Sequence, residues 1–133
     1  PDTGGLEGDL IELNRSIQST LSDDSSLVVA VIAAAFRDPD AAAALRRFWD
    51  DRYLRSEVVI DRAIARGEAP DDVDAHALLV ASTGPLYHHR LLLGHTLTVD
   101  DADHYARFAA HAATAPTATT SLRPSKGTSN GRS

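Results

Sequence analysis

Residues 82–94 carry the sequence STGPLYHHRLLLG, the second half of an apolar segment that begins near Asp74. On a helical wheel this segment presents large apolar side chains on nearly every side rather than along one stripe. A small bundle covers such a helix only in part from its own chain, so a second copy is expected to cover the remainder. The segment therefore predicts a helix at a dimer interface.

Two residues within this segment shape the expected helix. Pro85 lacks a backbone donor and crowds the carbonyl of Ala81, which predicts a kink. Gly84 allows another backbone to approach closely. Arg90 is expected to form an ion pair with the partner subunit. The full set of predicted interface residues is Leu79, Thr83, Gly84, Pro85, Tyr87, Arg90, Leu91, Tyr105, Phe108, Ala109 and Ala112.

Helical patterns account for the rest of the chain up to about residue 113. Leucines and Ile17 recur every three or four residues from Leu6 to Leu21, which indicates an amphipathic helix. The wholly apolar stretch from Leu27 to Phe36 is expected to be the central, most buried helix. A long helix is expected from Pro39 to Gly67, and a last one from Thr98 to Ala113. The pattern predicts an all-α bundle of about five helices.

Length and composition bound the class of protein. With 133 residues and 43% hydrophobic content, the chain fits one domain, predicted over residues 1–113. Residues 114–133 are rich in Thr, Ser, Pro and Gly, which predicts a disordered tail. The absence of cysteine excludes disulfides and thiolate sites. No apolar run is long enough to span a membrane and no signal peptide is recognisable, so we expect a soluble, cytoplasmic protein.

The charge distribution argues against direct binding of nucleic acid. Three of the 13 basic residues and none of the 19 acidic ones follow Thr114, so residues 1–113 hold 10 basic and 19 acidic groups, a balance of −9. Contact with phosphates needs a basic face. We therefore expect that any DNA contacts belong to another part of the protein.

A candidate ligand pocket is indicated by polar groups that accompany an apolar stripe of the long helix. Trp49, Arg52, Tyr53 and Ser56 combine apolar surface with a few orienting groups, as small-molecule pockets require. Two alternatives remain open: Arg52 could extend to solvent or pair with an acid such as Glu12, and the aromatic residues could simply form core. The predicted ligand-binding set is Phe36, Phe48, Trp49, Arg52, Tyr53, Ser56, Ser82 and Leu86.

Catalytic and metal chemistry find little support. His104 and His111 share a helix face, and Asp100 or Asp101 could join His104, but neither His-Glu-x-x-His nor Glu-x-x-His occurs. Phosphate loops and nucleophile elbows are also absent. We predict no enzyme activity, no metal site and no cofactor. The alternative is a small helical-bundle metal-binding protein or enzyme that uses His104, His111 and the nearby aspartates.

Four motifs together resemble a known family. PDTGGL-x-GD-L (Pro1–Leu10), FRDPD (Phe36–Asp40), RAIARGE (Arg62–Glu68) and GPLY-x-x-RLL-x-G (Gly84–Gly94) are similar to the carboxy-terminal regulatory domain of TetR-type transcriptional repressors. Their order and spacing match throughout residues 1–113. Pro1 stands where the linker from an amino-terminal helix-turn-helix head would enter this domain.

The resemblance implies an all-helical domain that binds an effector and dimerises through its last two helices. It also implies that effector binding changes the separation of two DNA-binding heads, which releases operator DNA. The expected partners are therefore a second copy of the chain, a small apolar effector and, through the head only, DNA. A third possibility is a domain that only dimerises and has filled its pocket with side chains.

Overall fold

The structure is a computed structural model that describes residues 1–24 and 26–114, and the described residues form helices and loops without a strand. The elements are α1 (Leu6–Ser22), α2 (Leu27–Ala35), α3 (Pro39–Ala65), α4 (Ala75–Tyr87), a π-helical turn η1 (His88–Leu92) and α5 (Val99–Thr114). The prediction of an all-α bundle of about five helices is confirmed. The predicted tail lies outside the described residues, except for Thr114, which ends α5.

The helix starts follow from capping residues that the sequence shows. The Asp38 side chain accepts a hydrogen bond from a backbone N–H in the first turn of α3, with Pro39 at the first helical position. Asp74 caps α4 in the same way. At the start of α5, Thr98 and Asp101 exchange reciprocal side chain to backbone bonds of 3.1 and 2.9 Å, a capping box.

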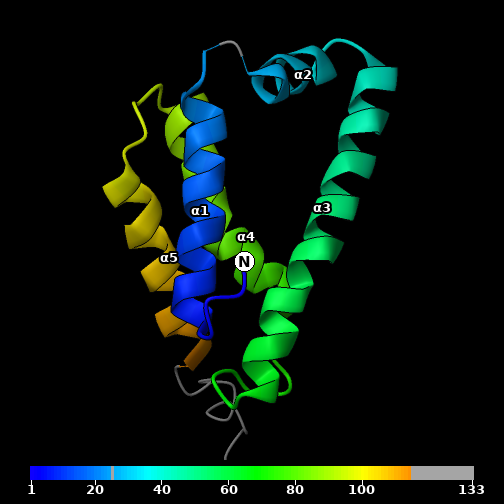
Figure 1. The fold of residues 1–133 in the computed structure, drawn as a ribbon. Coiled ribbons are helices and arrows are strands. Elements are labelled where there is room, and N and C mark those ends of the chain that lie inside the picture. The colour runs from blue at the N-terminus through cyan, green and yellow to red at the C-terminus, as the bar shows by residue number, and fades with distance from the viewer. Residues whose placement is uncertain (25, 115–133) are drawn as a thin grey trace, which may run out of the picture.

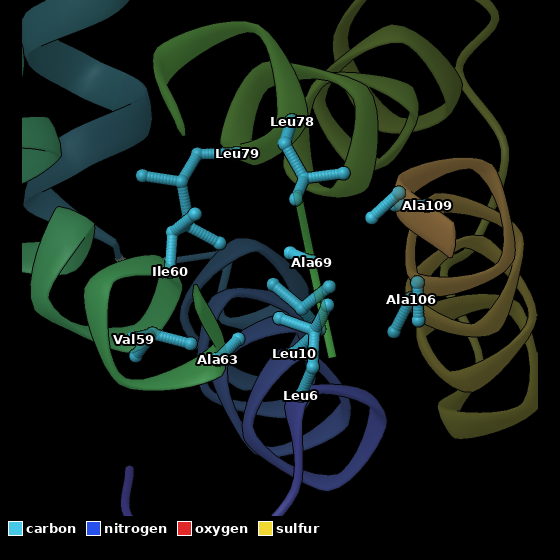
Figure 2. Close-up of a cluster of buried hydrophobic side chains, with 12 residues drawn as sticks. Leu6, Leu10, Val59, Ile60, Ala63, Ala69, Leu78, Leu79, Ala106 and Ala109 are labelled. Atoms are coloured by element: carbon cyan, nitrogen blue, oxygen red, sulfur yellow. The ribbon is translucent and has the colours of Figure 1, made fainter. Parts of the chain in front are cut away.

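The main core lies where α1, α4, α5 and the second half of α3 meet (Figures 1 and 2). Small side chains on α5 let its axis come close to α1, since alanine occupies little space between helices. Leucines of α1 and α4 fill the centre. The buried residues labelled in Figure 2 are Leu6, Leu10, Val59, Ile60, Ala63, Ala69, Leu78, Leu79, Ala106 and Ala109.

A buried polar residue ties three helices together. The Asn14 amide, which is fully buried, donates to the carbonyl oxygens of Ser82 at 2.8 Å and Ala102 at 3.0 Å. The Ser82 hydroxyl donates back to Asn14 Oδ1 at 3.0 Å. Beside them, Arg15 donates two bonds of 2.7 Å to the Asp103 carboxylate. Helices α1, α4 and α5 are therefore held as one unit by polar contacts as well as by packing.

The prediction that the apolar segment Leu27–Phe36 forms the most buried helix is wrong. Helix α2 contains no buried residue, and the Leu27 and Phe36 side chains are 76% and 86% exposed. The helix lies at one end of the molecule, where it bridges the far ends of α1 and α3 (Figure 1). Apolar composition shows that a helix needs cover, but it does not show that the same chain provides that cover.

Two further features differ from a uniform bundle. Buried residues of α3 are confined to its second half, at Val59, Ile60 and Ala63, because the first half runs away from α1 (Figure 1).

Helix α4 continues through Pro85, and the change in hydrogen bonding comes three residues later, in η1. There the Leu93 N–H donates to the carbonyl five residues earlier, at 3.1 Å, as in a π-turn.

Candidate functional site

A small cavity lies between α1, α3 and α4. Its volume is about 10 Å³, which is room for about one water molecule. Helix α3 contributes four of the residues predicted for the pocket, and α1 and α4 supply the opposite walls. The lining residues are Leu13, Ile17, Trp49, Arg52, Tyr53, Ser56, Leu79, Thr83 and Tyr87.

Aromatic rings fill most of the space between these helices. Trp49 meets Tyr87 edge to face, with ring centres 5.1 Å apart, and lies 6.0 Å from the ring centre of Tyr53. Tyr53 in turn meets His76 of α4 edge to face at 4.8 Å. Because Trp49 and Tyr87 come from α3 and α4, an occupant too large for the cavity that enters between these helices has to separate the two rings.

The polar groups in the cavity wall differ in how well they are satisfied. The Thr83 hydroxyl donates to the Leu79 carbonyl at 2.9 Å, and the Ser56 hydroxyl donates to the Arg52 carbonyl at 2.9 Å. The half-buried guanidinium of Arg52 forms no ion pair with a carboxylate of residues 1–24 or 26–114. Its central carbon lies 5.9 Å from the Phe48 ring centre.

Burial determines the protonation state of the Tyr87 phenol, which lines the cavity. Removal of Tyr87 from water raises its pKa to about 12, and the positive charge of Arg52 acts in the opposite direction without cancelling that effect. Tyr87 is therefore a neutral group at physiological pH. A ligand that enters the cavity meets one fixed positive charge and no fixed negative charge in the wall.

An open apolar groove shares Val28 and Phe48 with a second small gap, which in turn shares Ile17, Trp49, Arg52 and Tyr87 with the cavity. The groove lies between α2 and the first half of α3, and its volume is about 270 Å³. Sequence reasoning missed this groove because it placed α2 at the centre of the bundle. The groove is lined by Leu27, Val28, Val31, Ala44, Leu45 and Phe48.

The predicted ligand-binding residues separate into three groups. Trp49, Arg52, Tyr53 and Ser56 do line one cavity, and Phe48 lines the groove and the small gap between groove and cavity. Phe36 lies at the exposed end of α2, outside the cavity wall.

Ser82 and Leu86 face the other way, into the interior between α1, α4 and α5, and both are fully buried. The Ser82 hydroxyl is already bonded to Asn14, so neither residue is available to a ligand in this cavity.

Several predicted interface residues are internal to the subunit. Leu79, Thr83 and Ala109 are at most 3% exposed, so a second chain cannot reach them. Tyr87 lines the cavity. The error arises because a helix that is apolar on all sides does not reveal which side its own chain covers.

Arg90, which was predicted to pair with the partner subunit, has partners within its own chain. Its Nε donates to the Leu21 carbonyl at 3.1 Å, and its terminal nitrogen pairs with Asp24 at 3.2 Å. These bonds tie η1 to the end of α1. Tyr105, another predicted interface residue, is half-buried, and its hydroxyl oxygen lies 2.7 Å from His89 Nε2 of η1.

The remaining predicted residues lie on outward faces of α4, η1 and α5. Phe108 is 71% exposed, and Ala112 lies one turn further along the same face. A Cβ atom at Gly84 would meet only the Val80 side chain, at 3.8 Å, so the space beside it is open. Pro85 and Leu91 are half-buried. These faces leave apolar surface without cover from the described residues.

The histidine-based alternative receives no geometric support. Among the described residues, no group of three or more His, Asp or Glu side chains could hold a metal ion. His104 instead makes ring contacts with Tyr105 and Phe108, at 5.3 and 6.2 Å between ring centres. Within residues 1–24 and 26–114, no helix is long and apolar enough to cross a membrane.

Comparison with known proteins identifies the family. A search of curated proteins found no match for this chain. A family model for the tetracyclin repressor-like C-terminal domain matches residues 1–109 of the 133. The matched region includes the cavity, the groove and most of α5, and it agrees with the all-helical architecture. The chain therefore belongs to the tetracyclin repressor-like family and contains its C-terminal domain, which serves transcription regulators in ligand binding and dimerisation.

Proposed function

We propose that this chain is the effector-sensing and dimerising domain of a TetR-like transcription regulator, whose operator contacts are made by residues outside this chain. The observation that carries the proposal is the aromatic cavity between α3 and the unit formed by α1 and α4, within a domain of this family. The effector is a small, largely apolar molecule, because six of the nine lining residues are Leu, Ile, Trp or Tyr.

The closed cavity supports a mechanism based on two arrangements of α3. With Trp49 and Tyr87 in contact at 5.1 Å, the cavity has no room for an organic ligand. An effector therefore binds only an arrangement in which α3 moves away from α4. Such unequal affinity for two arrangements is what allows a ligand to shift their populations.

Contacts at the far end of α3 connect this movement to the start of the chain. Arg62 pairs with Asp2 at 3.4 Å, and Glu68, just beyond α3, accepts a hydrogen bond from the Leu6 N–H at 3.1 Å. Arg66 holds the Glu68 carboxylate at 2.8 Å. A shift of α3 would therefore displace the first residues of α1, the side from which a DNA-binding head would be attached.

The ligand-binding part of the proposal is tested by a thermal-shift screen of lipophilic compounds on the full chain. A compound that binds only the folded protein raises its midpoint of unfolding. Trp49 is the only tryptophan, so binding should also change the intrinsic fluorescence. Trp49→Ala should alter the affinity, whereas Leu54→Ala, at a 69% exposed site on the same helix, should not. If no compound shifts the midpoint, the domain is a dimerisation module with a filled pocket.

The dimer would form through the outward faces of α4, η1 and α5. Light scattering on the full chain should give the mass of a dimer at micromolar concentration. Phe108→Glu should give monomers, because it places a charge in the apolar interface. Leu54→Glu is the matched control, since it adds the same charge at an equally exposed apolar site outside these faces. A monomeric wild-type chain, or a dimer that tolerates Phe108→Glu, would contradict this assignment.

A further inference from the structure

Arg52 is the only charged residue in the wall of the cavity between α1, α3 and α4. Its side chain is half-buried and therefore partly removed from water. A guanidinium that is partly removed from water gains a strong charge-assisted hydrogen bond when it pairs with a carboxylate. Within the described part of the chain, Arg52 has no such partner.

The neighbouring acidic side chains among the described residues do not form an ion pair with Arg52. Asp51, the next residue on α3, pairs with Arg55 at 2.9 Å. No Asp or Glu lines either the cavity or the apolar groove between α2 and α3. The charge of Arg52 does act on the interior, since it opposes the effect of burial on the pKa of Tyr87. Arg52 thus lines the cavity beside Trp49 and Tyr87, and it also lines an open pocket on the outer side of α3 that includes Asp51 and Arg55.

Apolar space begins next to this cation. Phe48 lies one turn before Arg52, with its ring centre 5.9 Å from the guanidinium carbon, and it lines the groove. Phe48 and Val28 of the groove also line a small gap together with Arg52. The groove volume of about 270 Å³ is close to the lower limit of about 300 Å³ for small-molecule pockets. Its six lining residues are all apolar. A positive group and an apolar channel therefore adjoin at Phe48.

We infer that the effector is an amphiphilic carboxylate, with its carboxylate on Arg52 and its apolar chain in the groove between α2 and α3. This inference rests on the proposed ligand-sensing function and specifies the chemistry of that site. The planar fork of N–H groups in arginine matches the two oxygens of a carboxylate. A carboxylate is also smaller than a phosphate, so it needs a smaller movement of α3 away from α4 to reach Arg52.

The test uses three probes of equal chain length on the full protein: decanoate and decyltrimethylammonium below their critical micelle concentrations, and decanol below its solubility limit. Binding is followed by the fluorescence of Trp49, which lies in the cavity wall. Arg52→Gln removes the charge and keeps a shorter, polar side chain. Arg47→Gln is the matched control, because Arg47 is exposed on the same helix and has no ion pair among the described residues.

Arg52→Gln should weaken decanoate binding about tenfold, the expected loss for one charge-assisted hydrogen-bonded pair, and should change decanol binding less than about twofold. Arg47→Gln should leave both affinities unchanged, and the cationic probe should bind more weakly than decanol. An equal loss for decanoate and decanol would show that Arg52 only supports the fold, and would overturn the inference while the ligand pocket stands. Failure of all three probes to bind would overturn the inference together with the pocket.

Discussion

The substitution Asn14→Ala tests the polar connection that holds α1, α4 and α5 together. It removes three buried hydrogen bonds, two donated to the carbonyls of Ser82 and Ala102 and one accepted from the Ser82 hydroxyl, with lengths of 2.8 to 3.0 Å. A hydrogen bond within a protein contributes a net of about 1 kcal/mol to stability. For the three bonds together, the free energy of unfolding should fall by about 3 kcal/mol.

Urea denaturation followed by circular dichroism measures this loss. The slope of the free energy of unfolding against urea concentration should not change, which would show that the folded and unfolded states keep their compactness. The matched control is Gln18→Ala, which removes another amide from α1. Its bonds to Ser22 at 3.0 Å and to the Leu97 carbonyl at 3.1 Å lie nearer the surface. The control should cost less than about 1 kcal/mol. If the two substitutions cost the same, the Asn14 cluster does not contribute as the geometry indicates.

Three further predictions concern charge, packing and capping. The Arg15 hydrogen bonds lower the pKa of Asp103, so this carboxylate stabilises the fold above its unfolded pKa of about 4 and loses that effect as pH falls through the lower folded pKa. Asp103→Asn should therefore lower the free energy of unfolding at pH 7. The free energies of unfolding of variant and wild type should converge in acid, and a difference that stays constant with pH would contradict this. Gly84→Leu should weaken dimerisation at least about tenfold in sedimentation equilibrium while the monomer stays folded, because its Cβ points into open space where the partner is proposed. Thr98→Ala should cost about 1 kcal/mol in thermal unfolding, since the reciprocal bond with Asp101 caps α5, and no change would rule out that role.

The helix starts and the wall of the cavity could be predicted because both depend on local sequence. Asp38, Asp74 and Thr98 act through their own first turns, so the residues alone indicate where each helix begins. Trp49 and Arg52 lie on one stripe of a single helix, and that spacing keeps them together in any fold in which α3 is straight.

The position of α2 and the outward side of α4 could not be predicted, because they depend on contacts distant in sequence. Helix α2 is apolar throughout and therefore carries no stripe to show which side its chain covers. In α4, Leu79 and Val80 are adjacent and equally apolar, yet one is fully buried and the other is 40% exposed. Their environments follow from Asn14 and α5, which hold one side of α4 inward.

In the proposed mechanism, an effector changes the arrangement of two chains at their amino ends. The chain contains no cysteine, so Glu7→Cys provides one spin label per subunit at the start of α1. The pair of Glu7 with Arg107, at 3.6 Å and more than half exposed, contributes little to stability. Pulsed electron paramagnetic resonance on the dimer should show that the label separation changes when a compound from the thermal-shift screen binds. An unchanged separation, while Trp49 fluorescence shows that the compound is bound, would contradict the account.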